Sequence, residues 1–404
     1  MGDPALIKVF ERFGKLFSKS FLRKRKMKIK IMKNEILEGA IPAAGFASNK
    51  NTIASTEGIL LKTLSDKECE LCAYDLEKGM KTTVTCVVEE AGAAIINCQR
   101  FIQIVKAMPD GLLSIDIDEK TLRAKISGGK AEFELQALSA ADFPDLPELR
   151  GDRAFKIKQS RLKEILYKTQ FAIAQNSVRP ELNGLDFKVE NDILTAVSCD
   201  GNRLSIVSGI EPLESVGTSE LKFDVIIPGK SISELTRFIS DSDDEITVYV
   251  ARKHIIFMID RFVLFTRRID ADYVDYDRFI PKAPKIFVTV ETSALVSALE
   301  RALLVTEEKR AGQMPSPVIL RLEEGTLEVT SSSVTGKVND VITVKHEGEG
   351  LEIGFNCRFL YDAVKVCNCE KIKLSLTSPL MSMTVEDADG GDFLLLILPV
   401  RLNR

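Results

Sequence analysis

The sequence predicts an α+β fold built from three repeated domains, each made of antiparallel sheets and two helices. Three observations indicate this class. One strand–helix pattern recurs three times, at spacings of 126 and 133 residues. A second strand–helix pattern follows the first within each unit, 66, 71 and 66 residues later. Strands also greatly outnumber helices and lack the βαβ rhythm of a parallel sheet, which favours antiparallel pairing.

The helices are predicted from alternating strand residues that give way to helical spacing of apolar residues. The first pattern occupies residues 29–41, 155–169 and 288–304. The second occupies residues 94–108, 225–239 and 353–367. Asn97, Pro228 and Asn356 take the same turn position in the second pattern. The chain therefore reads as six half-units, paired into three domains.

The strands are predicted from alternating apolar and polar residues between these helices. Such runs cover residues 83–90, 112–118, 122–138, 185–208, 245–269, 318–333, 372–378 and 380–387. Asp200-Gly201, Glu324-Gly325 and Gly128-Gly129 are predicted hairpin turns. Proline-bearing linkers are predicted at residues 142–152 and 278–285. We expect an extension at residues 1–26 and domains at residues 27–150, 151–281 and 282–404.

Composition limits the class of protein. The chain has 404 residues, 45% of them hydrophobic, which is typical of two or three globular domains. It contains no run of 18 or more apolar residues, so we expect no membrane-spanning helix. Of the net charge of −4, residues 1–26 carry +6 and the other 378 residues carry −10. Taken alone, the net negative charge of residues 27–404 argues against a protein that binds nucleic acid through its whole surface.

Residues 1–26 place apolar side chains at helical spacing with basic residues between them, which predicts a basic amphipathic helix. Such a helix binds a membrane surface or organelle import machinery, so a membrane-recruited adaptor is one hypothesis. The alternative is an upstream leader or an added extension, because Met27 opens the first repeat unit.

Cysteine and histidine usage favours a non-catalytic, cytoplasmic protein with reduced thiols. A secreted disulfide scaffold would be shorter and richer in cysteine, and no secretory signal is visible. Cys69 and Cys72 lie in a predicted strand, where such positions face opposite sides, so a structural role is favoured over a shared metal. The two histidines, His254 and His346, are isolated. We expect no metal and no cofactor.

One segment approaches a catalytic motif. Gly229-Lys230-Ser231 follows a strand and opens a helix, as in a phosphate-binding loop. Asp224 stands where that motif needs its first glycine, and its charge would repel a polyphosphate. A hydrolytic or metal-dependent enzyme using a carboxylate cluster is the alternative hypothesis, which turnover or tightly bound metal would support. Threefold repetition without a unique reactive cluster favours a scaffold.

The second helix of each repeat carries more basic than acidic residues. The cations are Arg100 and Lys106, Lys230 and Arg237, and Arg358 and Lys365. Their recurrence predicts one basic surface assembled from equivalent helices. Sparse cations without aromatic stacking residues would hold phosphates weakly and without sequence preference.

Six short motifs are spread over the three predicted domains. They are LSAADFPDL at 138–146, VRPELNGLDF at 178–187, CDGNRL at 199–204, YVDYDRFIP at 273–281, LEIGFN at 351–356 and LPVRL at 398–402. With the threefold repeat, these motifs make the sequence from Met27 to its end resemble the bacterial DNA polymerase III beta subunits, the beta sliding clamps.

The resemblance implies three DNA-clamp domains in a crescent, or half ring, two of which pair head to tail around duplex DNA. The implied function is a ring-shaped processivity factor, not an enzyme, that encircles DNA and tethers the replicative polymerase. The implied partners are non-specifically bound duplex DNA, DNA polymerase subunits, the clamp loader, repair and replication factors with clamp-binding peptides, and a second copy of the chain. Enclosure makes tight contact unnecessary, so weak basic helices within an acidic body are expected.

The resemblance also implies a hydrophobic pocket that receives short peptides of these partners. Its residues here are Leu182, Cys199, Gly201, Asn202, Arg203, Leu204, Val274, Arg278, Phe279, Asn356, Leu380, Ser382, Leu396, Leu398, Pro399, Val400, Arg401 and Leu402. The apolar members would hold Leu and Phe anchors, while Arg203, Arg278 and Asn356 would orient the peptide. Asn202 stands where the family often has His, and Val274 where Pro is frequent.

The DNA-facing residues implied by the resemblance are Lys50, Arg100, Lys106, Asn176 and Arg179, to which the helix charges add Lys230, Arg237, Arg358 and Lys365. Pro180 and Glu181 stand where some members have DNA-contacting tyrosines.

Overall fold

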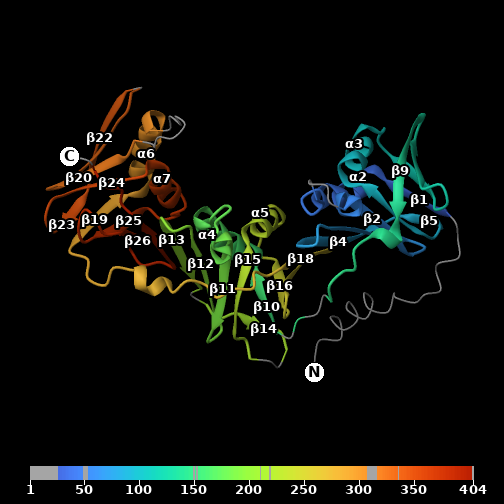
Figure 1. Cartoon of the computed structure of the whole chain (residues 1–404), viewed down its shortest axis with the longest axis horizontal. Helices are drawn as coiled ribbons and strands as arrows, with labels where there is room; N and C mark the ends of the chain where they lie inside the picture. Colours follow the sequence, from blue (N-terminus) through green and yellow to red (C-terminus); the bar gives the residue numbers. More distant parts are fainter. Residues whose placement is uncertain are drawn as a thin grey trace. The chain divides into compact units, whose positions relative to one another are not determined.

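The computed structural model describes residues 26–48, 53–148, 151, 153–209, 211–217, 220–306, 316–334 and 336–402. The chain forms two compact units, whose elements are labelled in Figure 1. The first comprises Met1–Gln159, Glu214–Glu220 and Arg237–Arg268, and the second Ser160–Leu213, Leu221–Thr236 and Ile269–Arg404. The predicted middle domain therefore contributes strands to both units.

The first unit is organised by one sheet of 14 strands in which all pairings are antiparallel. From edge to edge these are β14 (Glu214–Ser215), β10 (Arg153–Lys158), β16 (Glu245–Val250), β17 (His254–Ile259), β18 (Phe262–Arg267), β4 (Lys78–Thr85), β3 (Glu68–Tyr74), β2 (Gly58–Ser65), β6 (Ala93–Asn97), β9 (Ala131–Ser139), β8 (Arg123–Gly128), β7 (Leu112–Asp118), β1 (Lys26–Met32) and β5 (Val87–Glu90). Two short 3-10 helices flank strands of this sheet: η1 (Ala54–Glu57) precedes β2, and η2 (Ala140–Asp142) follows β9.

Two helices cover part of this sheet, α2 (Lys33–Ala43) and α3 (Cys98–Ala107), and they pack against each other. Each begins directly where a strand ends, α2 after β1 and α3 after β6. At the start of α3, the Asn97 side chain accepts a hydrogen bond from the Arg100 backbone at 3.1 Å, which satisfies a donor left open by the first turn. Both predicted strand–helix units of this region are confirmed.

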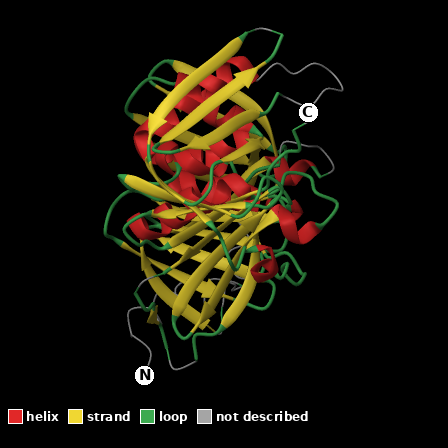
Figure 2. Ribbon diagram, turned by 90° about the vertical axis from the view of Figure 1, so that its left-hand side faces the viewer, coloured by secondary structure: helices red, strands yellow, loops and turns green. Residues whose placement is uncertain are grey.

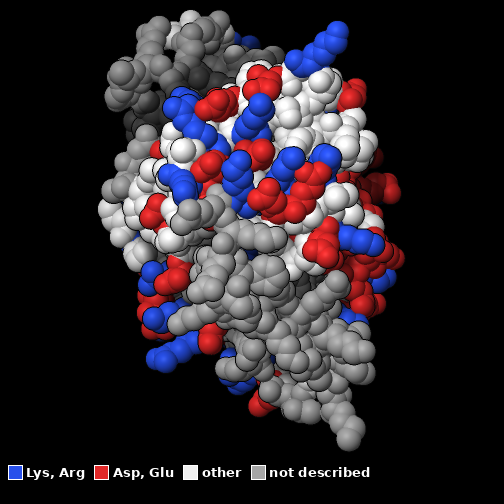
Figure 3. Space-filling view, turned by 90° about the vertical axis from the view of Figure 1, so that its right-hand side faces the viewer, with Lys and Arg blue, Asp and Glu red and all other residues white. Residues whose placement is uncertain are grey.

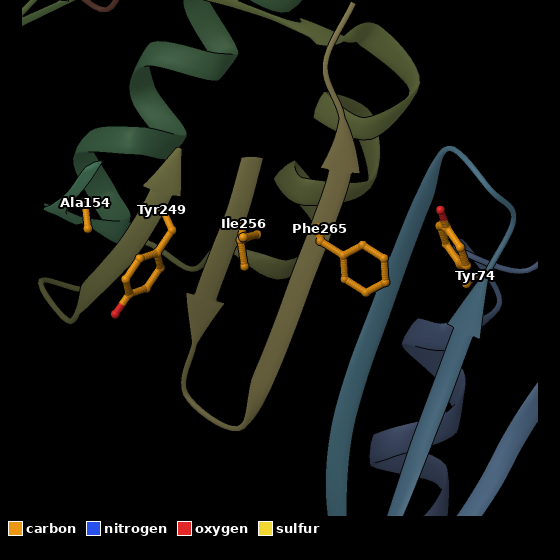
Figure 4. Packing of buried hydrophobic residues seen from close by; sticks show 5 residues of the cluster. All are labelled: Tyr74, Ala154, Tyr249, Ile256 and Phe265. Carbon is orange, nitrogen blue, oxygen red and sulfur yellow. The ribbon is translucent and has the colours of Figure 1, made fainter. Parts of the chain in front are cut away.

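The pairing of β18 with β4 joins strands of the predicted middle domain to strands of the predicted first domain. A buried cluster of Tyr74, Ala154, Tyr249, Ile256 and Phe265 lies across this junction (Figure 4). The rings of Tyr74 and Phe265 are 5.4 Å apart. Phe143 and Leu146 pack against the cluster, so the first part of the predicted linker is held on the sheet.

Charged side chains of both signs are interspersed on the face of the first unit seen in Figure 3. Ion pairs cross the outer strands of the sheet, where Lys28 and Lys30 meet Glu89 at 2.9 and 2.6 Å, and Lys125 meets Glu132 at 2.8 Å. These outer strands therefore present a surface of mixed charge and not a basic one.

The second unit contains two antiparallel sheets. The nine-stranded sheet runs β15 (Phe223–Pro228), β11 (Gly184–Glu190), β12 (Ile193–Cys199), β13 (Arg203–Ser208), β27 (Phe393–Ile397), β26 (Met383–Asp387), β25 (Lys371–Leu376), β19 (Ile286–Glu291) and β23 (Lys345–Glu347). The four-stranded sheet runs β22 (Lys337–Thr343), β21 (Thr326–Ser332), β20 (Val318–Glu323) and β24 (Leu351–Phe355). The pairing of β13 with β27 joins the predicted second and third domains.

Four further helices follow strands, either directly or after a single residue. They are α4 (Gln159–Thr169), α5 (Gly229–Phe238), α6 (Thr292–Thr306) and α7 (Cys357–Lys365). Helices α6 and α7 pack together, and the Asn356 side chain caps α7 by accepting from the Phe359 backbone at 3.2 Å. All six predicted strand–helix units are thus confirmed, and strands predominate as the α+β prediction requires (Figure 2).

Candidate functional site

An apolar cluster in the second unit contains several of the predicted pocket residues. Its buried members are Leu182, Val197, Cys199, Leu204 and Leu396. They come from η4 (Pro180–Asn183), β12, β13 and β27. Cys199 lies opposite Leu204, and Leu204 lies opposite Leu396, so three adjacent strands present these side chains on one face.

The turn between β12 and β13 positions one border of this cluster. Gly201 has a φ of +89°, a left-handed conformation that glycine adopts without strain. The Asp200 carboxylate accepts from the backbone nitrogens of Asn202 and Arg203 at 2.9 and 3.0 Å. This side-chain turn holds Asn202 at the tip of the hairpin, where it is exposed.

Arg203 is held by both predicted domains of the second unit. Its guanidinium donates to Asp200 and to Asp362 of α7, each at 2.9 Å. It also lies over the rings of Phe171, in η3 (Gln170–Ala172), and Phe359, at 5.2 and 4.5 Å. Only 11% of its side chain is exposed. The guanidinium thus fixes the hairpin relative to α7.

Residues 398–402 lie beside the same hairpin. The Leu398 backbone donates to the Asn202 carbonyl at 2.8 Å, and the Val400 backbone donates to the Gly354 carbonyl at 2.8 Å. A Cβ at Gly354 would come within 2.6 Å of the Leu402 side chain, so these two residues lie in close contact. Residues 398–402 are therefore held between the β12–β13 hairpin and β24.

The remaining predicted pocket residues differ in exposure. Val274 packs against the apolar cluster, and Ser382 is buried. Three apolar side chains are exposed, namely Phe279 in η5 (Tyr276–Phe279), Leu380 and Leu398, at 50%, 68% and 43%. The others are placed as follows: Arg278 pairs with Asp275 at 2.6 Å, Arg401 is exposed, Pro399 is half-buried, and Asn356 caps α7.

Five residues of the cluster were not singled out from the sequence. They are Val197, Ala174, Ile206, Tyr273 and Tyr276. Strand alternation was the available signal for Val197 and Ile206, which face the same side as Cys199 and Leu204. No periodicity identifies Tyr273 and Tyr276, because they belong to a segment between strands.

A buried acidic residue was also missed. Asp186 lies opposite Val197 in the sheet and is 2% exposed. Among the described residues, its Oδ1 atom has no hydrogen-bond partner. Burial, and then the neighbouring Asp224 carboxylate, raise the pKa of Asp186 to about 8. The visible signal was an acidic residue placed between the apolar residues Leu185 and Phe187 of the strand.

Of the predicted DNA-facing residues, Lys50 lies outside the described residues. The side chains of Arg100, Lys106, Asn176, Arg179, Lys230, Arg237, Arg358 and Lys365 are exposed. Arg179 pairs with Glu181 at 2.9 Å, and Arg358 pairs with Asp362 at 3.1 Å. The Lys365 ammonium lies 5.2 Å from the Tyr361 ring. Some of these residues lie in the first unit and the others in the second. Arg358 and Lys365 both lie on α7.

The thiols of Cys69 and Cys72 are fully buried in β3, and this burial raises the pKa of both well above the ordinary value. Among the described residues, no group of three or more His, Cys, Asp or Glu side chains has metal-binding geometry. None of the described helices is long and apolar enough to cross a membrane. The predicted amphipathic helix falls on residues 1–26, of which only Lys26 is described.

Comparison with known proteins gives one consistent match. Models of the DNA polymerase III beta subunit match residues 27–147 (N-terminal domain), 156–275 (central domain) and 277–401 (C-terminal domain). The "Beta sliding clamp" of Pseudomonas putida is 30% identical over 379 residues, covering 93% of this chain and 100% of that protein.

Solved structures agree. The DNA polymerase sliding clamp of Bacillus subtilis superimposes with a TM-score of 0.86 at 27% identity, and the Pseudomonas aeruginosa clamp bound to griselimycin with 0.83 at 28%. In both cases the match covers 93% of this chain and all of the other.

Proposed function

The chain belongs to the family of beta sliding clamps, the beta subunits of DNA polymerase III, and from this we propose how its two units carry out that role. As a member of the family it is a DNA sliding clamp, a processivity factor of DNA replication and not an enzyme. We propose that two half rings close around duplex DNA. The observation that carries this proposal is the sixfold strand–helix repetition, with exposed cations on its second helices.

A loading experiment tests enclosure. The protein is loaded onto nicked circular DNA, the DNA is linearised, and bound protein is separated from free protein before and after cutting. A ring that holds DNA by enclosure stays on the circle and slides off the linear product. Release from the intact circle would contradict the proposal.

Two unpaired strand edges support closure by a second copy. Residues 131–136 of β9 pair on one side with β8, and β22 is the last strand of its sheet; among the described residues no strand covers the other side of either. An unpaired edge is a template for pairing with another chain. We propose that β9 of one protomer pairs with β22 of the partner subunit, head to tail.

Exposed apolar side chains accompany both edges. Leu304 of α6 is 85% exposed, and α6 lies against β22, where Arg301 donates to Asp340 at 2.6 Å. Phe133 of β9 is 39% exposed. Together they would cover one another when the edges pair, which supports an obligate contact rather than a transient one.

We propose that partner proteins bind the apolar cluster of the second unit through short hydrophobic peptides. The cluster supplies buried apolar walls, and Phe279, Leu380 and Leu398 supply exposed apolar surface for Leu and Phe anchors. The partners proposed are polymerase subunits, the clamp loader, and repair and replication factors. Fluorescence anisotropy with a labelled peptide containing such anchors tests this assignment, and the same peptide binding equally to a Leu182→Ala variant would contradict it.

The finer assignments belong to the same proposal. The domains are proposed at residues 27–150, 151–281 and 282–404, with DNA facing the exposed cations of α3, α5 and α7. Replication factors act where the chromosome is, so we propose a cytoplasmic location. The absence of a spanning helix among the described residues is compatible with it.

A further inference from the structure

The Arg203 guanidinium already makes contacts within the chain that leave little of it accessible to a partner peptide. It donates to Asp200 and Asp362, lies over two aromatic rings and is 11% exposed. Its evident effect is to fix the β12–β13 hairpin, whose ends carry Cys199 and Leu204 of the apolar cluster. The affinity of the cluster for a peptide therefore depends on how firmly Arg203 is held.

Asp362 holds Arg203 and is itself shared. Its Oδ2 atom accepts from the terminal nitrogen of Arg203 at 2.9 Å. Its Oδ1 atom accepts from Nε of Arg358, one turn earlier on α7, at 3.1 Å. Arg358 is 56% exposed, whereas Asp362 is 23% exposed. One carboxylate thus joins an exposed cation on the proposed DNA-facing side to a nearly buried cation at the peptide site.

We propose that Asp362 is a positioning residue for partner-peptide binding, and that it makes this binding respond to DNA through Arg358. The inference rests on the proposed peptide site and on the proposed DNA-facing role of α7. It goes beyond both, because it assigns a function to a residue that touches neither ligand and predicts a coupling between them.

The coupling follows from competition for Arg358. A DNA phosphate is a strong bidentate acceptor for a guanidinium and draws Arg358 away from Asp362. The Asp362 carboxylate then pairs with Arg203 alone. Because this ion pair is no longer shared, Arg203 holds the β12–β13 hairpin more firmly. Peptide affinity should rise on DNA binding by about two- to fivefold, the effect of one partly exposed ion pair. Coupling is reciprocal, so the peptide should raise DNA affinity by the same factor.

The test measures peptide affinity by fluorescence anisotropy, with and without saturating short duplex DNA at low salt. The peptide carries Leu and Phe anchors and no charge, so that DNA neither attracts nor repels it directly. The expected result for the parent protein is tighter peptide binding with DNA. In Asp362→Asn, the expected result is weaker binding without DNA and no response to DNA.

A second variant gives the opposite sign and does not depend on the first one folding. In Arg358→Gln the competitor is absent, so the peptide should bind about two- to fivefold more tightly than to the parent even without DNA, and DNA should add nothing. A purely structural role of Asp362 would not produce this gain. Glu324→Gln is the matched control, because it removes one carboxylate from an exposed turn of the same unit and should retain the parental response.

Each outcome is decisive. Tightening by DNA that persists in Asp362→Asn, or its absence in the parent protein, overturns the coupling and leaves the peptide site intact. No gain in Arg358→Gln overturns the competition. Failure of the parent protein to bind the peptide at all overturns the proposed peptide site together with this inference.

Discussion

Replacing Leu304 by alanine tests ring closure at the most exposed apolar side chain of α6. Leu304 is 85% exposed within the chain, so its loss should leave the fold of the protomer intact. In a dimer with this side chain buried, removing its outer carbons costs about 2 kcal/mol at each interface. A closed ring has two equal interfaces, so the cost is about 4 kcal/mol. This corresponds to about a thousandfold higher dimer Kd.

Sedimentation velocity over a dilution series measures that Kd. Val178→Ala is the matched control, because Val178 is 98% exposed but belongs to the segment before η4 and to neither strand edge. The variant Leu304→Ala should dissociate at concentrations where the parent and the control remain dimeric. A dimer Kd within about threefold of the parental value would refute the placement of Leu304 in the interface.

Three further outcomes are expected. Leu182→Ala should weaken peptide binding about tenfold or more in anisotropy while sedimentation still shows a dimer; an equal effect of Leu112→Ala, in the first unit, would contradict this. Asp186→Asn should be more stable than the parent in urea unfolding, by a margin that grows from pH 4 to pH 8 with a slope of at most about 1.4 kcal/mol per pH unit. The reason is that the folded state keeps the proton up to its pKa of about 8, whereas the unfolded state loses it near pH 4, so parental stability falls as the pH rises; a constant margin would contradict the raised pKa. Arg100→Ala should weaken binding to open-ended duplexes but leave retention on closed circles within about twofold, because enclosure holds the DNA; lost retention would argue for contact instead.

Local patterns predicted the elements well because the local signals and the fold agree. Each helix begins at the end of a strand or one residue after it, and at α3 and α7 an asparagine at the repeated turn position caps the first turn. The hairpin turns were predictable for the same reason, since Gly201 and Gly325 take left-handed conformations. The division of the middle domain between two units was not predictable, because pairings such as β18 with β4 join segments far apart in the sequence.

The candidate site was predictable only in part. The resemblance to a known family identified Leu182, Cys199, Leu204 and Leu396, which the structure places in one cluster. It did not identify the partners of Arg203, because Asp362 lies 159 residues away and an ion pair leaves no periodic trace in the sequence. Nor did it identify Tyr273, whose position depends on how an irregular segment packs.

The continuous backbone pairing across the predicted domain boundaries has a consequence for expressing parts of the protein. A fragment ending near residue 150 would expose β4 along the side that β18 occupies, and a middle fragment would expose both β18 and β13. Bare strand edges of this kind recruit other strands without selectivity. Fragments cut at the predicted linkers would therefore be prone to aggregate and would not behave as independent domains. A usable truncation would need to keep each of these strand pairs together.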